Sequence, residues 1–154
     1  MKQGKHSEND GVQFREITQD TVREICALSV QEKQNIFVTP NAISIAEAYF
    51  SKYAWFRAIY LDSVPVGFVM LDDRPEKAEY FLWRFMIDQQ FQGRGIGREA
   101  FKLLIKYVRT RPNSLELLTT VVQAEGGPEG FYRNMGFKLT GEYEEGEAVM
   151  SILL

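Results

Sequence analysis

Three glycines at alternating positions, Gly93, Gly95 and Gly97, stand directly before an apolar-periodic run in QQFQGRGIGREAF. Glycine costs helix stability, so this cluster indicates backbone that another group must approach closely. Successive backbone N–H groups at a helix N-terminus bind anions, because the helix dipole places partial positive charge there. Arg94 and Arg98 lie within the same turn and add charge. We therefore predict a site for a phosphate or a diphosphate.

Two common nucleotide-binding patterns do not fit this loop. The P-loop needs a Lys-Ser/Thr pair after its last glycine, but Arg98 and Glu99 follow here, which removes the hydroxyl for magnesium. The dinucleotide fingerprint needs G-x-G-x-x-G and an acid at the end of the next strand. Here the spacing is G-x-G-x-G and the next apolar run ends in TTVV. The loop is therefore predicted to bind a different phosphate ligand.

The spacing of the apolar residues predicts one α/β domain around this loop. A helix is expected over 95–109, and the run FLWRFMI within 78–88 is expected to be a central strand covered on both faces. Ser44 and Glu47 form a capping box, which predicts a helix over 44–53. The other expected elements are strands over 12–17 and 115–122, helices over 20–30 and 128–135, a hairpin turning at DSVP and a C-terminal hairpin across EEGE. The order is β, α, α, β, β, β, α, β, α, β, β.

Length and composition agree with a single domain. The chain has 154 residues, of which 45% are apolar and 13% aromatic, enough for one core. We expect this domain over 12–154, and we expect the polar residues 1–11, which contain the single histidine His6, to be a disordered leader. No apolar run reaches the length of a membrane span and no signal peptide opens the chain. The sequence therefore predicts a soluble cytoplasmic protein without a membrane partner.

Charge and cysteine content argue against several other classes of protein. The net charge is −3 without a basic block, which does not support a nucleic-acid partner. The single cysteine, Cys26, excludes an internal disulfide and a cysteine metal cluster, so no metal is expected and a packed helical thiol is predicted. Residues 141–147, GEYEEGE, concentrate four glutamates. This segment favours either a solvated hairpin or a rim that attracts cations.

The glycine loop, Gln92-Gly93-Arg94-Gly95-Ile96-Gly97, resembles the Q/R-x-x-G-x-G/A motif of the GNAT superfamily, the GCN5-related N-acetyltransferases. The segment FYRNMGF, 131–137, resembles the second signature of that family, and the predicted element order matches it over 12–154. The resemblance implies a single-domain α/β fold. In this fold a mixed, mostly antiparallel sheet is flanked by about four helices and its central parallel strands are splayed.

The resemblance also implies acetyl-CoA as cosubstrate and assigns roles to individual residues. Tyr132 matches the tyrosine that protonates the departing thiolate, and a phenol with an ordinary pKa near 10 is a plausible donor. The backbone of Phe85, Met86 and Ile87 would bind the pantetheine arm in the gap beside the splayed strand. The expected phosphate contacts, made mostly through N–H groups, are Gln92, Gly93, Arg94, Gly95, Ile96, Gly97 and Arg98.

Two positions depart from the family pattern. Glu125 stands where the family often has an asparagine that binds the pantetheine arm, so backbone of that loop would have to substitute. Trp83 stands on the central strand where polyamine-acetylating relatives often carry a glutamate. The general base is therefore left open between Glu47, Glu79 and a water relay.

The chain most resembles bacterial acetyltransferases of spermine, spermidine or diamines, which implies a small primary amine as substrate. Such an amine is mostly protonated at pH 7, so an acidic pocket would bind the cation before a base deprotonates it. Glu47 and the glutamates 142, 144, 145 and 147 could supply this field. A protein N-terminus, an aminoglycoside or an amino acid remains an alternative acceptor, and a non-catalytic acyl-CoA-binding module remains a second alternative. Relatives are often dimers, so the resemblance allows a homodimer.

Overall fold

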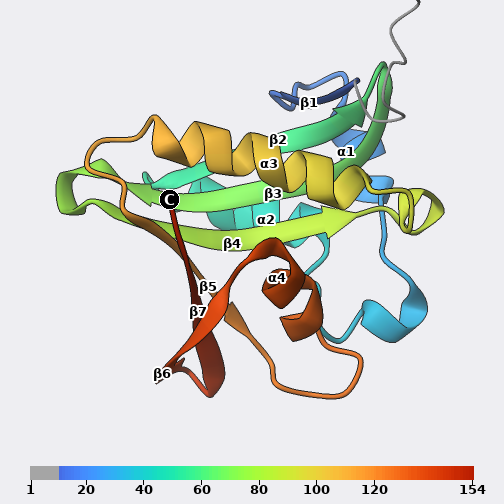
Figure 1. Cartoon of the computed structure of the whole chain (residues 1–154). Helices are drawn as coiled ribbons and strands as arrows, with labels where there is room; N and C mark the ends of the chain where they lie inside the picture. Colours follow the sequence, from blue (N-terminus) through green and yellow to red (C-terminus); the bar gives the residue numbers. More distant parts are fainter. Residues whose placement is uncertain (1–10) are drawn as a thin grey trace, which may run out of the picture.

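A seven-stranded sheet is the centre of the computed structural model, which describes residues 11–154 (Figure 1). The strand order is β1-β2-β3-β4-β5-β7-β6, and only β4 and β5 pair in parallel among the described strands. The strands are β1 Val12–Arg15, β2 Ala54–Leu61, β3 Val64–Arg74, β4 Glu79–Ile87, β5 Glu116–Val121, β6 Lys138–Glu144 and β7 Glu147–Leu153. The predicted fold class is confirmed.

Helices cover both faces of the sheet, and the sheet separates two hydrophobic clusters. The larger cluster contains the buried side chains of α3, together with Tyr132 and Phe137, and the smaller one contains residues of α1 and α2. In Figure 1, α3 lies on the near side of the sheet, and α2 lies on its far side. The α-helices are α1 Val22–Ala27, α2 Asn41–Tyr49, α3 Ile96–Arg109 and α4 Glu129–Met135, and the short 3-10 helices are η1 Glu32–Gln34, η2 Pro75–Lys77 and η3 Gln89–Phe91.

Strand β4 is the central strand that its apolar run predicts. Leu82 and Ile87 pack into the larger cluster, while Met86 packs into the smaller one, so both faces of the strand are covered. The register with β3 shifts between Met70↔Arg84 and Leu71↔Leu82, which leaves Trp83 as an extra residue on β4. Such a bulge locally bends a strand and redirects its side chains.

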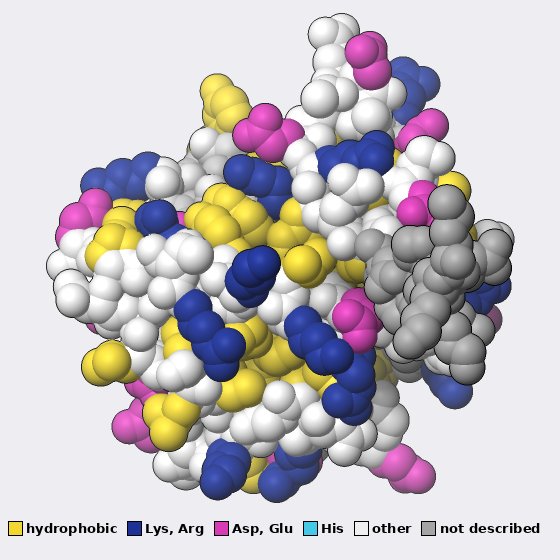
Figure 2. Space-filling model, turned by 45° about the horizontal axis from the view of Figure 1, so that its top comes forward, with side chains coloured by type: hydrophobic (Ala, Val, Ile, Leu, Met, Phe, Trp, Pro, Cys, Tyr) yellow, Lys and Arg dark blue, Asp and Glu magenta, His cyan; other side chains and the backbone are white. Residues whose placement is uncertain are grey.

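Helix α3 follows directly from its sequence pattern. Its buried side chains, among them Ile96, Phe101 and Leu104, recur at helical spacing and face the sheet. The basic side chains of this helix lie on its outer side, and Figure 2 shows Lys and Arg side chains separated by apolar and neutral surface over this part of the molecule. The predicted bounds, 95–109, differ by one residue because Gly95 is the N-cap.

Two helix predictions need correction. Helix α2 begins at Asn41 rather than Ser44, with Pro40 at its N-cap, and Ser44 is fully buried within the helix. The predicted capping box of Ser44 and Glu47 is therefore wrong. The amide of Asn41 donates to the Ile25 carbonyl at 2.9 Å, which fixes the start of α2 against α1. Helix α1 ends at Ala27, earlier than predicted, because the next residue is extended.

Both predicted hairpins are present. Asp62 has φ +54° in the turn between β2 and β3, and Glu145 and Gly146 have φ +49° and +84° in the turn between β6 and β7. Two consecutive positive φ values are typical of a tight hairpin turn. All of β6 is exposed, as expected for a solvated hairpin strand.

Three remaining predictions concern the ends and the environment of the chain. Residues 1–10 of the predicted leader, including His6, lie outside the described residues, and Cys26 is half-buried in α1. Within the described part of the chain, every helix is too short or too polar to cross a bilayer. Strand β1 covers only Val12–Arg15 of the predicted 12–17.

Candidate active site

Strands β4 and β5 run side by side at one end and separate toward the other. They pair at Phe81 and Leu118, and the Thr119 hydroxyl then donates to the Leu82 carbonyl at 3.0 Å in place of a backbone bond. Beyond this point the strands diverge (Figure 1). Phe85 and Val121 line a cavity in this region. This divergence of β4 and β5 beyond Leu82 and Thr119, here called the fork, leaves part of the β4 backbone beside open space in the middle of the sheet.

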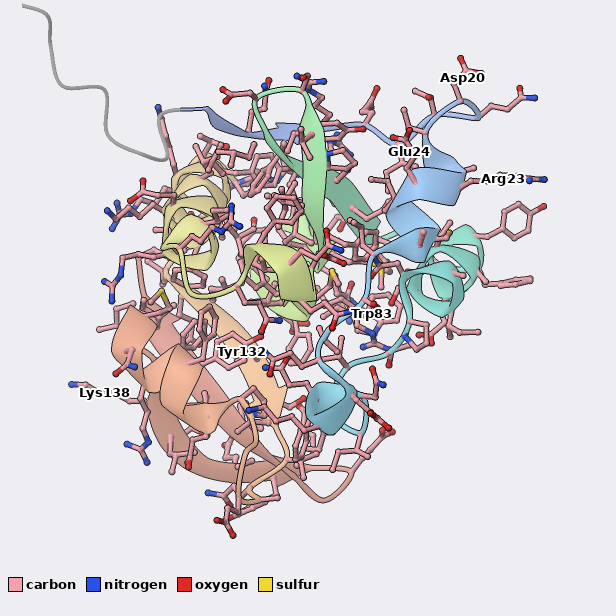
Figure 3. The ribbon with its side chains drawn as sticks, turned by 90° about the vertical axis from the view of Figure 1, so that its right-hand side faces the viewer. Asp20, Arg23, Glu24, Trp83, Tyr132 and Lys138 are labelled. Carbon is pink, nitrogen blue, oxygen red and sulfur yellow. The ribbon has the colours of Figure 1, made fainter. Side chains whose placement is uncertain are left out.

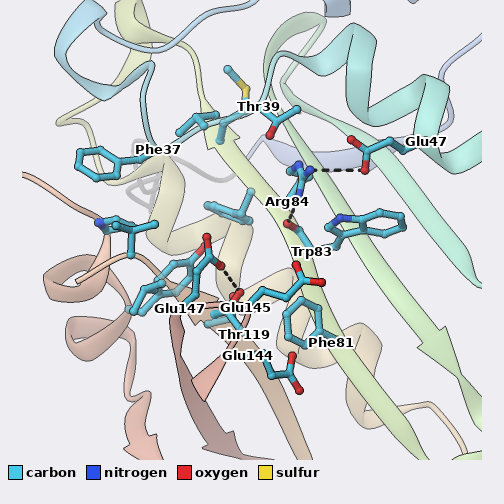
Figure 4. Close-up of a pocket in the computed structure, with 18 of the residues that line it drawn as sticks. Phe37, Thr39, Glu47, Phe81, Trp83, Arg84, Thr119, Glu144, Glu145 and Glu147 are labelled. Atoms are coloured by element: carbon cyan, nitrogen blue, oxygen red, sulfur yellow. Dashed lines mark hydrogen bonds and ion pairs between the residues drawn. The ribbon is translucent and has the colours of Figure 1, made fainter. Parts of the chain in front are cut away.

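Two cavities open at the fork. The first, of about 480 Å³, lies at the glycine loop and is called the loop cavity. The second, of about 850 Å³, carries several glutamates and is called the acidic cavity (Figure 4). Six residues line both cavities: Phe37, Val38, Phe85, Met86, Pro128 and Tyr132. The two cavities therefore meet at the phenol of α4.

The glycine loop has the backbone that its sequence predicts. Gly93 and Gly95 have φ +77° and +79°, in the left-handed region that favours glycine. The first hydrogen bond of α3 is from the Glu99 N–H to the Gly95 carbonyl at 3.2 Å, so the preceding N–H groups at the helix start have no acceptor within the helix. A Cβ at Gly97 would make ordinary contacts with Ile87 and Phe131, so the need for glycine is greater at the first two positions.

Side chains around the loop hold it in place. The Gln92 amide donates to the Ile87 carbonyl at 2.9 Å and to Gln34 Oε1 at 3.0 Å. The buried Asp88 carboxylate accepts from the backbone N–H groups of Gln90 at 3.1 Å and Ser29 at 2.8 Å. Asp88 and Gln34 were not recognised from the sequence. An aspartate between an apolar strand and a glycine loop is a detectable signal for Asp88, whereas Gln34 is distant in the chain.

Tyr132 lies in the interior of the molecule, between α4 and the fork (Figure 3). Its side chain is buried and packs edge-to-face against Phe131 and Phe137, with ring centroids 5.3 Å apart in both pairs. Burial raises the pKa of Tyr132 to about 12, and the nearby Thr119 hydroxyl lowers this pKa in part. The phenol is therefore protonated throughout the neutral pH range and available as a hydrogen-bond donor.

The acidic cavity has carboxylates from two sides. Figure 4 shows Glu145 and Glu147 on the side of the β6–β7 turn, and Glu47 with Arg84 on the opposite side. Arg84 Nη2 lies 3.6 Å from Glu47 Oε2, and Arg84 Nη1 donates to the Trp83 carbonyl at 3.0 Å. With Glu144 the cavity is lined by four carboxylates and one guanidinium. Its charge favours a cationic ligand.

Most of the residues predicted for the site line one of the two cavities. Glu47 and Trp83 line the acidic cavity, and Tyr132 lines both. The predicted cofactor residues that line the loop cavity are Phe85, Met86, Ile87, Gln92, Gly93, Gly95, Gly97 and Arg98. The structure thus brings together segments that are far apart in the sequence.

Four predicted residues lie outside the lining of both cavities. Ile96 is buried in the larger hydrophobic cluster, and the Arg94 guanidinium lies over the Phe91 ring at 5.4 Å. Glu125 is exposed, although the two glycines that follow it line the loop cavity. Glu79 is exposed at the first position of β4, far along the strand from the glycine loop. Its position removes the reason for proposing it as a base.

Several lining residues were not recognised from the sequence. Arg84 is the cation of the acidic cavity, Phe81 contributes an aromatic wall, and Phe37 and Val38 lie between the cavities. Apolar residues of this kind carry no motif. An arginine within the apolar run of a central strand is a signal that could have identified Arg84.

Several known proteins resemble this chain in sequence or in fold. Spermine/spermidine N(1)-acetyltransferase of Bacillus subtilis (strain 168) is 25% identical over 146 residues, which cover 90% of this chain and 96% of that protein. A domain from Methanocaldococcus jannaschii DSM 2661 has the same fold, with a TM-score of 0.74 at 16% identity, covering 93% of this chain and 98% of that one. The PaiA N-acetyltransferase from Thermoplasma acidophilum, solved in complex with coenzyme A, has a TM-score of 0.68 at 16% identity, covering 93% and 99%.

The family itself is shown by the sequence. Residues 18–137 match the family described as Acetyltransferase (GNAT) family, and this match spans most of the chain. It includes the glycine loop, the central strand β4 and the helix that carries Tyr132. The chain belongs to the GNAT family and is an N-acetyltransferase that takes its acetyl group from acetyl-CoA.

Proposed function

We propose that this enzyme acetylates a primary amine of a small polycation, a polyamine or diamine such as spermidine. The observation that carries the proposal is the acidic cavity, in which four carboxylates surround the space that adjoins Tyr132. The curated relative from Bacillus subtilis, named for spermine and spermidine, supports the same substrate class.

In this proposal acetyl-CoA enters through the loop cavity. The N–H groups at the start of α3 and in the glycine loop would bind its diphosphate, and Arg98 would add charge. The pantetheine arm would lie along the β4 backbone at Phe85, Met86 and Ile87, where the fork leaves the strand open on one side. The thioester would then reach the junction of the two cavities.

The amine would enter through the acidic cavity as a cation. Carboxylates attract the protonated amine, while the rings of Phe81 and Trp83 offer an apolar wall to its methylene groups. Its reacting nitrogen must lose a proton before it attacks. Of the acidic residues considered as a base, Glu47 lines this cavity, and we propose that it accepts the proton directly or through water.

The chemical step is attack of the neutral nitrogen on the acetyl carbonyl. The C–N bond forms to give a tetrahedral intermediate, then the C–S bond breaks, and the electron pair leaves with the sulfur. Tyr132 is proposed as the general acid that donates its proton to this sulfur, and the nitrogen of the intermediate gives up its extra proton to restore the phenol, directly or through water, as the amide forms. A thiol has an ordinary pKa of about 8.5, so the Tyr132 phenol is the weaker of the two acids. The hydrogen bond from the phenol to the sulfur therefore strengthens mainly as negative charge develops on the sulfur.

An amine panel tests the proposal through release of CoA. Spermidine, an aminoglycoside, a free amino acid and a peptide with a free N-terminus would each be supplied with acetyl-CoA. We expect turnover with spermidine at lower concentration than with any other acceptor. Turnover with only the peptide would replace the polyamine by a protein N-terminus, and tight CoA binding without turnover of any of the four acceptors would contradict the proposed amine substrate.

A further inference from the structure

The segment 31–39, here called the shared wall, contributes to both cavities. Phe37 and Val38 line the loop cavity and the acidic cavity alike. Thr39 lines the acidic cavity, and Gln34 lines the loop cavity. The shared wall therefore lies between the place proposed for the cofactor and the place proposed for the amine.

One pair of side chains connects the shared wall to the glycine loop. Gln92 Nε2 donates to Gln34 Oε1 at 3.0 Å while it also donates to the Ile87 carbonyl at 2.9 Å. The backbone N–H groups of Gln34 and Phe37, by contrast, bond to the carbonyls of Gln31 and Gln34 inside the wall itself. The bond between the two glutamines thus joins a locally bonded segment to the end of β4.

The Gln34 side chain is bonded both to the shared wall and to Gln92 of the glycine loop. Its Oε1 also accepts the backbone N–H of Gln31 at 3.1 Å, so the same oxygen holds the 3-10 helix η1 and the loop side chain. The side chain is half-buried, which limits competition from water. A ligand that fixes Gln92 will therefore restrict η1, and Phe37 and Val38 follow in the turn after η1.

We infer that the Gln34–Gln92 hydrogen bond couples cofactor binding to ordering of the shared wall, which makes Gln34 a positioning residue for the amine site. CoA bound at the glycine loop orders the wall, and the ordered wall binds the amine more tightly. By linkage, the amine must increase CoA affinity by the same factor. The effect on the amine rests on the proposed amine substrate, whereas the ordering of the wall rests only on the proposed binding of CoA at the glycine loop.

The size of the coupling follows from the type of bond. A neutral hydrogen bond between side chains is worth about two- to tenfold in an equilibrium. Hydrogen exchange of a peptide that covers 31–39 measures the ordering without any amine, with CoA as the probe. In the wild-type protein we expect saturating CoA to slow this exchange about two- to tenfold.

Two substitutions at Gln34 separate the bond from the bulk of the side chain. Gln34→Leu removes the acceptor and should abolish the CoA-dependent slowing, although CoA is still bound at saturation. Gln34→Glu keeps an acceptor for both donors and should retain the slowing. Lys33→Ala, at an exposed neighbour in η1, is the matched control and should behave as wild type. If Gln34→Leu does not fold, Gln92→Leu removes the same bond from the other side.

Equal slowing in wild type and in the folded Leu variants, or no slowing in wild type, would overturn the inference. The same variants then report on the amine that the panel identifies. We expect its KM to rise about two- to tenfold in Gln34→Leu with kcat little changed. Failure of spermidine as substrate would contradict the proposed function but would leave the exchange result intact, so the two failures are distinguishable.

Discussion

In the loop cavity, one continuous stretch from the end of β4 through the glycine loop to the start of α3 carries the proposed diphosphate site, and the segments 30–38 and 126–135 complete the lining. The acidic cavity is lined by side chains from α2, β4, β5 and the β6–β7 hairpin, which are far apart in the chain. Backbone N–H groups are proposed to bind the diphosphate in the loop cavity, and carboxylates are proposed to bind the amine in the acidic cavity. A site made of backbone depends on φ and ψ and thus on glycine. A site made of side chains depends on which residues the hairpins and helices bring to it.

The largest expected effect is loss of CoA affinity at the loop cavity when Gly95 is replaced. Gly95→Glu places a charged side chain at φ +79° beside the proposed diphosphate, so backbone strain and charge repulsion both oppose binding. We expect CoA affinity in calorimetry to fall by about 100-fold or more while circular dichroism stays unchanged.

A companion variant, Gly95→Ala, adds only the strain and should lose less affinity than the Glu variant. Amine selectivity should stay the same in any residual activity. Wild-type affinity of Gly95→Glu for CoA would end the assignment of the glycine loop to the diphosphate.

A second test concerns the point where the two cavities meet. Tyr132→Phe removes the proposed proton donor and keeps the ring that packs against Phe131 and Phe137. We expect kcat to fall about 10- to 100-fold with CoA affinity within about twofold of wild type. Steady-state kinetics and calorimetry on the same samples measure both quantities. An unchanged kcat would remove the general-acid role.

A smaller effect is expected from single carboxylates of the acidic cavity. Glu145→Gln should raise the KM for a polyamine about three- to tenfold and leave CoA affinity unchanged, because one of several attractive charges is lost. Glu142→Gln is the matched control, since Glu142 is exposed on β6 outside the lining of the cavity.

The salt dependence of kcat/KM tests the same charge effect. We expect kcat/KM for the polyamine to fall as ionic strength rises in wild type, and to fall less in Glu145→Gln. Equal KM values in Glu145→Gln and Glu142→Gln would show that the field of the hairpin does not select the substrate.

The smallest expected effect concerns stability at high pH. The pKa of Tyr132 is raised to about 12, above the value near 10 expected for an unfolded chain. The buried phenol therefore stabilises the fold fully below pH 10, and this contribution is lost as the pH rises from 10 to 12. Between pH 8 and pH 11, wild type should lose about 1 kcal/mol more unfolding free energy in urea than Tyr132→Phe. Equal losses would mean that the phenol titrates normally.

Much of the fold was predictable because its signals are local. The apolar spacing of α3, the run FLWRFMI of β4 and the glycines before α3 each lie within one short stretch, and each gave the right element. The start of α2 was not predicted correctly. Its position depends on Asn41 binding the Ile25 carbonyl of another helix, a contact that no local pattern reports.

The same distinction holds for the two halves of the site. The residues of the glycine loop are neighbours in the chain, so their motif alone is enough to indicate the loop cavity. The sequence did not predict the pairing of Arg84 with Glu47 or the bond between Gln34 and Gln92, since each joins residues far apart in the chain. The sequence left the base open between Glu47, Glu79 and a water relay, and of the two glutamates the fold places Glu47 at a cavity and leaves Glu79 exposed.

From the sequence alone came the order of the elements, the phosphate-type loop and the family resemblance, because hydrophobic periodicity and glycine conformation are properties of short segments. Tertiary structure decided that β4 and β5 part beyond Leu82, that two cavities meet at a buried Tyr132, and that β6–β7 carries its glutamates to the face of β4. These features arise from strand pairing and packing between distant segments. Their energies depend on burial and charge in three dimensions, which a linear pattern does not contain.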